Sequence, residues 1–194
     1  MSAEQRPPVM LDAKTTYWFP MRVTYGREQI VKEFLDTIDV ETFLPMTERV
    51  RRVGNKIVHE KVAAISNLIF VHSDKKTIDN LKHTRAQAEP LRYMTRPVRT
   101  DCGMINEIIV VPDRQMDNFI QVASAPDDQR TFLTADDLHG HAGDSVVISS
   151  GPFAGVEGVI KRIKGNRRVV VEIEDIGGVC INFVPKAFII KRTN

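Results

Sequence analysis

The sequence predicts an α+β protein, in which an α/β sandwich with an antiparallel sheet precedes a small five-stranded β-barrel. Over residues 16–123, clustered strand patterns are interspersed with amphipathic helix patterns, which is typical of a sheet covered by helices. Residues 124–139 are acidic and aperiodic, and are predicted to form a flexible linker. Residues 140–194 then contain five short strand patterns with Gly-bearing turns between most of them.

The sandwich is expected to begin with a strand over Tyr17–Thr24, in which Pro20 indicates an edge position or a bulge. From Arg27, apolar residues fall on one helical face and predict an amphipathic helix. Residues 1–15 are polar and aperiodic, and are predicted to be a disordered leader. The remaining elements are expected as strands at 42–44, 67–71, 91–94 and 107–111, a helix with Ile78 and Leu81, and a helix with Met116, Phe119, Ile120 and Ala123.

The composition argues against a membrane-spanning or secreted protein. The longest apolar runs have about four residues, whereas a membrane span needs roughly 20, so we expect no membrane-spanning segment. The first residues lack the apolar core of a secretory signal, and two cysteines cannot make a disulfide framework; both favour a cytoplasmic protein. We expect it to be a monomer. The net charge is +2, but residues 140–194 contain eight basic and five acidic residues, which indicates a mildly basic C-terminal part.

The sequence lacks the catalytic motifs that are easiest to recognise. The Gly-rich run 151–155 lacks the Gly-Lys-Ser/Thr of a phosphate-binding loop, and no nucleophile elbow is present. We therefore expect neither catalytic residues nor a cofactor. Residues 136–141 contain two aspartates and two histidines, but no second ligand pair follows at zinc spacing, so no metal site is expected either.

A basic β-hairpin is the clearest binding candidate. The dipeptide Gly54-Asn55 accepts positive φ and separates two strand patterns at 48–53 and 56–63. These strands contain Arg49, Arg51, Arg52, Lys56 and Lys61, together with His59, against Glu48 and Glu60. The charges either solvate the hairpin and protect it from edge pairing, or they contact nucleic-acid phosphates.

A second basic cluster lies across a turn in the C-terminal part of the chain. It comprises Lys161, Arg162, Lys164, Arg167 and Arg168. Five cations within eight residues exceed what solubility requires, and RNA is the candidate ligand. A solvated turn is the alternative.

Three segments carry a family resemblance. The run GDSVVISSGPFAGVEGVIKRIKGNRRVVVEI resembles a KOW motif, with its Gly-Asp before the first strand and Gly-Pro-Phe at the first turn. YWFPMRVTYGREQIVKEFLD resembles the opening strand and helix of the NusG amino-terminal domain, and ETFLPMTERVRRVGNKIVHEKVAAISNLIFVHSD resembles the segment that follows. The Phe43–Met46 run and the basic hairpin resemble specialised paralogues of the RfaH and UpxY type. The resemblance covers 16–123 and 140–192, but Ser66-Asn67-Leu68 replaces the family's frequent Pro-Gly-Tyr.

The resemblance implies a bacterial transcription elongation or antitermination factor with a KOW domain of SH3-like fold. Such a factor binds the clamp helices of RNA polymerase in an apolar concavity. The candidates for this concavity are Tyr17, Ile65 and Leu68. Alternatively, each of the three is an ordinary residue of the hydrophobic core. The hairpin would then lie beside the transcription bubble. Apolar turn residues of the KOW domain, here Phe153, Val156 and Ile176, would contact Rho or a small-subunit ribosomal protein, or simply cap the barrel. A ribosome-associated RNA-binding protein acting through the KOW barrel is the alternative function.

We predict that residues 140–194 form β-structure and no helical hairpin. Val169–Val171 favours strands, and each of the glycines in this part would cost up to about 1 kcal/mol inside a helix. Backbone chemical shifts of the full chain should therefore be those of strands over these residues. Helical shifts there would contradict the prediction.

Overall fold

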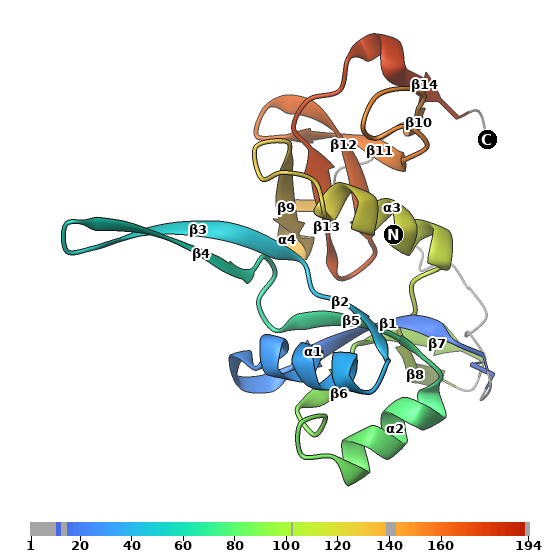
Figure 1. Ribbon diagram of the computed structural model, residues 1–194. Helices are drawn as coiled ribbons and strands as arrows, with labels where there is room; N and C mark the ends of the chain where they lie inside the picture. The colour runs from blue at the N-terminus through green and yellow to red at the C-terminus, as the bar shows by residue number, and fades with distance from the viewer. Residues whose placement is uncertain (1–10, 13–14, 102, 139–142, 193–194) are drawn as a thin grey trace. The chain divides into compact units, whose positions relative to one another are not determined.

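The computed structural model describes residues 11–12, 15–101, 103–138 and 143–192 (Figure 1). The chain forms two compact units. The first contains the residues up to Leu44 together with Ser66–Pro112, and the second contains Pro45–Ile65 and Asp113–Asn194. The predicted leader lies mostly outside the described residues, and so do His139 and His141. Among the helices of the described part, none combines the length and apolar character that a membrane crossing requires.

A four-stranded antiparallel sheet is the centre of the first unit. Its strand order is β2-β5-β1-β6, and β1 pairs with β5 from Tyr17↔Ser73 to Arg22↔Leu68. Side chains alternate between the two faces of a strand, so Phe19 and Met21 lie on one face with Val71 and Ile69 opposite them. All four of these side chains are fully buried. The strands are β1 (Tyr17–Val23), β2 (Glu41–Phe43), β5 (Leu68–Ser73) and β6 (Leu91–Tyr93).

Two helices, α1 (Glu28–Thr37) and α2 (Lys75–Thr84), lie on the same side of this sheet (Figure 1). The predicted apolar face of α1 is confirmed at Val31 and Leu35, which are buried. Asp74 caps α2, because its side chain accepts a hydrogen bond from the Thr77 amide at 2.9 Å. A short 3-10 turn, η1 (Thr24–Gly26), precedes α1.

The chain after β6 folds as a second hairpin, of β7 (Thr95–Thr100) and β8 (Gly103–Ile108). The sequence pattern predicted a single strand at 107–111 in this region. A cross-strand ion pair of 2.8 Å joins Arg96 to Glu107, which is only 6% exposed. This partner explains how a carboxylate can be buried here.

The second unit contains a six-stranded antiparallel sheet in the order β14-β10-β11-β12-β13-β9. All five strands predicted for the KOW region are present, which confirms the β-rich character of this part. Helix α3 (Asp113–Ala123) belongs to the same unit, and three residues of its predicted apolar face, Met116, Phe119 and Ala123, are buried. Ile120 is half-buried, and Val122, which was not predicted, is buried instead. The strands are β9 (Arg130–Thr134), β10 (Ser145–Ile148), β11 (Glu157–Ile163), β12 (Asn166–Ile173), β13 (Gly177–Ile181) and β14 (Ile189–Lys191). The short helices are α4 (Ala135–Leu138) and η2 (Lys186–Phe188).

Strand β9 corrects the predicted linker at 124–139. It pairs with β13 from Arg130↔Ile181 to Thr134↔Gly177, and so adds a sixth strand to the predicted five. At Gly177 the backbone has φ 140° and a Cβ would lie 2.5 Å from the Leu133 carbonyl oxygen, so only glycine fits beside β9. The acidic composition of this segment concealed a strand whose partner is more than 40 residues away. Prediction also placed α3 with residues 16–123, whereas its contacts are with the C-terminal sheet.

The predicted basic hairpin is present as β3 (Met46–Val53) and β4 (Lys56–Ala63), joined by a turn with Gly54 at φ 59°. From Glu48 to Ile57 every residue is exposed. The base of the hairpin, around Met46 and Ala63, is half-buried, and so are Val58 and Glu60 on β4. The hairpin therefore extends away from the rest of its unit (Figure 1).

We predict that the amides of β9 exchange as slowly as those of β13, because the two strands share one hydrogen-bonded ladder. Hydrogen exchange of the full chain, followed by mass spectrometry, measures this directly. The exposed turn at Gly54 and Asn55 provides a fast-exchanging internal reference. Rapid exchange across Arg130–Thr134 would show that this segment is a flexible linker and not a strand.

Candidate nucleic-acid interface

The register of the hairpin divides its side chains between two faces. Paired residues share a face, and the pairs run from Met46↔Ala63 to Val53↔Lys56. We call the two sets the Arg49 face and the Val50 face. The Arg49 face comprises Thr47, Arg49, Arg51, Val53, Lys56, Val58, Glu60 and Val62. The Val50 face comprises Met46, Glu48, Val50, Arg52, Ile57, His59, Lys61 and Ala63.

Both faces are basic, and the Arg49 face is the more so. It has three cations and one acid, and its one ion pair joins Arg51 to Glu60 at 3.5 Å. On the Val50 face, Glu48 lies 3.1 Å from His59. Within the described residues, Arg49, Lys56 and Lys61 form no ion pair. These exposed cations are available to a polyanion.

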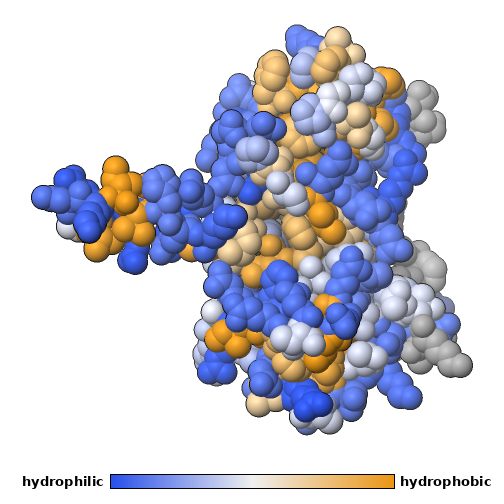
Figure 2. All heavy atoms as spheres, in the orientation of Figure 1, coloured by the Kyte–Doolittle hydropathy of each residue, from blue (hydrophilic) through white to orange (hydrophobic). Residues whose placement is uncertain are grey.

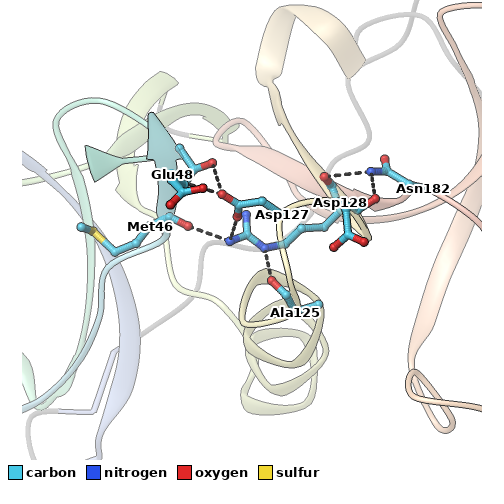
Figure 3. A network of polar contacts seen from close by, with 8 residues as sticks. Met46, Glu48, Ala125, Asp127, Asp128 and Asn182 are labelled. Atoms are coloured by element: carbon cyan, nitrogen blue, oxygen red, sulfur yellow. Dashed lines mark hydrogen bonds and ion pairs between the residues drawn. The ribbon is translucent and has the colours of Figure 1, made fainter. Parts of the chain in front are cut away.

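A buried guanidinium fixes the base of the hairpin. Arg130, the first residue of β9, is 8% exposed. Its Nη2 donates to the Met46 carbonyl at 2.8 Å, and its Nε donates to the Ala125 carbonyl at 2.7 Å (Figure 3). The Phe132 ring lies under the guanidinium, 4.5 Å from centroid to Cζ. One side chain therefore ties β3 to β9 and to the turn after α3.

Asp127 completes this connection from the turn. One carboxylate oxygen lies 2.5 Å from Nη2 of Arg130, and the other accepts from the Glu48 amide at 2.6 Å and from the Thr47 hydroxyl at 3.1 Å (Figure 3). Partial burial alone would raise the pKa of Asp127. The hydrogen bond from Glu48 and the charge of Arg130 outweigh burial and lower this pKa.

Asn182 extends the network to the end of β13. Its amide group donates to the carbonyls of Asp128 at 2.8 Å and Arg130 at 3.0 Å (Figure 3). Its side-chain oxygen accepts from the Thr131 hydroxyl at 2.7 Å and from Arg168. The base of the hairpin is thus continuous, through hydrogen bonds, with three strands of the sheet.

The second basic cluster does not form one surface. Register pairs Lys161 with Arg168 and Arg162 with Arg167, so the two pairs point to opposite faces of the β11–β12 ladder. Lys161 is 7% exposed and forms a 2.5 Å ion pair with Glu172. Its prediction as a nucleic-acid contact is therefore wrong, and half-buried Arg168 is bonded to Asn182 instead. The exposed members are Arg162, Lys164 and Arg167.

Two known families match parts of this chain. The family described as transcription termination factor NusG matches residues 16–120, which is more than half of the chain, and the KOW motif matches residues 142–172. The chain belongs to the NusG family. Among curated proteins, none matches it. The NusG match includes the basic hairpin, and the KOW match covers β10, β11 and most of β12.

The KOW residues predicted to bind a partner are buried in this NusG-family chain. Phe153 and Ile176 are each 8% exposed and Val156 is fully buried, so the prediction of exposed turn contacts is wrong for this structure. Helix α3 lies against the same turns. Gln121 donates to the Pro152 carbonyl at 3.3 Å, and Gln115 donates to the Glu172 carbonyl at 2.6 Å.

The three residues predicted to grip polymerase do not gather either. Tyr17 and Leu68 lie at opposite ends of the β1–β5 ladder and on opposite faces, because Leu68 pairs with Arg22, five residues from Tyr17. Leu68 is 3% exposed and is a core residue here. Tyr17 is half-buried, and Ile65 belongs to the second unit. Tyr17 and Leu68 therefore do not line one groove of the first unit.

The KOW unit has a different exposed apolar feature. A hollow of about 330 Å³ lies between the turn after α3, the β10–β11 turn and the segment after β13. Phe183 on its rim is 78% exposed. Asp128 and Asn182 supply polar groups beside it. The apolar lining includes Ile148, Pro152, Phe153, Val184, Pro185 and Phe188.

Sequence reasoning missed Asp127 and Arg130, which hold the hairpin in place. Asp127 lies in the acidic segment that the sequence predicts to be a linker. A signal was present nonetheless: Arg130–Thr134 contains two threonines, Phe132 and Leu133 in five residues, and this composition favours a strand.

We predict that Asp127→Asn destabilises the second unit at neutral pH by about 1 kcal/mol, a small loss because the carboxylate is partly exposed. The pKa of Asp127 is lower in the folded chain than its ordinary value of 3.8, so its contribution is complete above that value. The contribution is lost as the pH falls through the folded pKa. Urea unfolding of parent and variant should therefore differ at pH 7 and converge near pH 2. A difference that persists at pH 2 would show that the carboxylate charge is not responsible.

Proposed function

We propose that this NusG-family protein is a bacterial transcription elongation or antitermination factor of the specialised RfaH and UpxY type. It binds RNA polymerase, reduces pausing or termination, and recruits a second partner through the KOW domain. Its action is binding rather than catalysis: by binding the elongating state more tightly than the paused state, it shifts the population toward elongation.

The basic hairpin is the observation on which this proposal rests. Its two strands contain five Lys and Arg residues against two Glu, and all five of these cations are exposed. The Arg130 and Asp127 contacts fix its base, so the cations are presented on an anchored support. Such an arrangement suits contact with phosphates of the nucleic acid in the transcription complex.

Polymerase binding is proposed from family membership. The buried position of Leu68 removes it as a contact, whereas half-buried Tyr17 stays a candidate. For the KOW partner, Rho or a small-subunit ribosomal protein, the hollow beside Phe183 is a better candidate surface than the buried turn residues. An apolar side chain that is 78% exposed beside an apolar hollow is a common feature of protein interfaces.

An RNA-binding protein of the ribosome is the second candidate function. The exposed cations Arg162, Lys164 and Arg167 at the β11–β12 turn favour it. Retention of purified RNA polymerase after nuclease treatment separates the two. A transcription factor should remain bound, whereas a protein that binds through RNA should be lost.

We predict that Arg49→Glu with Arg51→Glu weakens binding to nucleic acid more than Arg52→Glu with Lys61→Glu. The first pair lies on the face with more cations and reverses two potential phosphate contacts there. Each lost contact should reduce the salt slope of log K by about 0.9. Titrations at several salt concentrations, paired with elongation assays through a pause site, measure both affinity and activity. Polymerase retention should survive at moderate salt.

Lys76→Glu with Lys186→Glu is the matched control, because both lysines are exposed, lie outside the hairpin and give the same change in net charge. This control variant should reduce pausing as much as the parent protein does. If it reduces activity as strongly as the hairpin variants do, net charge and not the hairpin is responsible. If the hairpin variants abolish polymerase retention, the hairpin contacts polymerase itself.

A further inference from the structure

The hollow of the KOW unit combines an exposed aromatic ring with a carboxylate. Among the large apolar side chains of the second unit that the structure describes, Phe183 is the most exposed, at 78%. Phe188 is half-buried and Phe153 is buried, and their rings line the same hollow. Figure 2 shows apolar residues interspersed with hydrophilic ones on the surface of this unit. An exposed phenylalanine beside an apolar hollow indicates a surface that a ligand covers.

Asn182 does not recognise that ligand, because its side chain is already saturated. Its amide group donates to the carbonyls of Asp128 and Arg130, and its oxygen accepts from Thr131 and Arg168. These hydrogen bonds use both donors and both acceptor positions of the side chain. Asn182 therefore shapes the wall of the hollow without offering a polar contact.

Asp128 is the one charged residue in the lining of the hollow. Its carbonyl is bonded to Asn182, whereas its carboxylate forms no hydrogen bond or ion pair within the described residues (Figure 3). The carboxylate of neighbouring Asp127, in contrast, is bonded to the base of the hairpin and to Arg130. The hollow thus offers a free negative charge and no lining cation, which is complementary to a positively charged ligand.

Arg130 shows how this unit binds a guanidinium. Its Cζ lies 4.5 Å from the ring centroid of Phe132, and its Nη2 lies 2.5 Å from the Asp127 carboxylate. A guanidinium is planar and weakly hydrated, so an aromatic ring contacts its face while a carboxylate accepts from its edge. Phe183 and Asp128 supply the same two groups at the hollow, where none of the lining residues is an arginine. A lysine suits them less, because its ammonium is compact and strongly hydrated.

The size of the hollow fits a side chain better than a cofactor. Its volume is about 330 Å³. Sites for small molecules and cofactors range from about 300 to 1,000 Å³, so this one is at the lower end. Its lining is otherwise apolar and suits the aliphatic part of a long side chain.

We propose that the hollow binds an arginine side chain of a partner protein, with the guanidinium on the Asp128 carboxylate and against the Phe183 ring. The inference rests on the proposed function and deepens it, because it names the chemistry by which the KOW partner is recognised at this surface. The apolar lining supplies contact area, and the carboxylate distinguishes arginine from a neutral side chain of the same shape.

The test titrates the full chain with three short peptides that differ only in a central arginine, lysine or citrulline. Citrulline has the shape of arginine without its charge. The parent should bind the arginine peptide about fivefold more tightly than either of the other two. Nuclear magnetic resonance measures these affinities, and the largest chemical-shift changes should occur at the amides of Phe183 and Asp128.

Two variants separate the carboxylate from the ring. Asp128→Asn keeps the shape of the side chain and removes its charge, so it should lose the fivefold preference for arginine over citrulline. Phe183→Leu keeps an apolar side chain and removes the ring, so it should weaken arginine binding about threefold. Asp136→Asn and Tyr25→Leu are the matched controls, because they change an exposed acid and an exposed aromatic residue outside the hollow. Both controls should bind the peptides as the parent does.

The comparison of the three peptides on the parent needs no variant, so it stays decisive if a substitution affects folding. Equal affinity of the parent for the arginine peptide and either of the others overturns the inference. So does an Asp128→Asn variant that melts as the parent does and keeps the preference. Neither outcome alters polymerase retention, which tests the proposed function separately. A parent that prefers the arginine peptide but does not retain polymerase supports the ligand of the hollow and overturns the proposed function.

Discussion

The buried guanidinium of Arg130 is the contact on which the arrangement of the second unit depends. Its Nε donates to the Ala125 carbonyl, and its Nη2 contacts both the Met46 carbonyl and the Asp127 carboxylate; these partners come from the hairpin base and from the turn after α3. A charged group that is 8% exposed is tolerated only when such partners surround it. Because the partners belong to the hairpin base and to the turn after α3, these elements must meet at β9 for the charge to be satisfied.

This requirement gives the hairpin a fixed base and a free end. At the base, backbone groups of Met46 and Glu48 are bound by Arg130 and Asp127. At the free end, side chains are exposed on both faces, and neither face contributes to a core. A two-stranded ribbon is marginal by itself in water, so attachment at the base allows the rest to present its charges to a ligand.

The two basic clusters of the sequence have different structural outcomes for one geometric reason. In the hairpin, both faces meet solvent, so all five of its Arg and Lys side chains are exposed. In the β11–β12 ladder, one face packs inward, and it takes Lys161 into an ion pair with Glu172. Because side chains alternate along a strand, only half of a charge cluster reaches solvent where one face of the sheet packs inward.

The sequence by itself determined the elements with strong local periodicity, the basic hairpin with its Gly54-Asn55 turn, and membership of the NusG family. Local patterns suffice for these because helix and strand periods depend on neighbouring residues alone. The tertiary structure decided which residues were core, partner or surface. Leu68, Phe153 and Lys161 are buried by segments distant in sequence, and β9 exists as a strand because β13 offers it an edge. Burial and strand pairing are properties of distant contacts, and a linear pattern does not contain them.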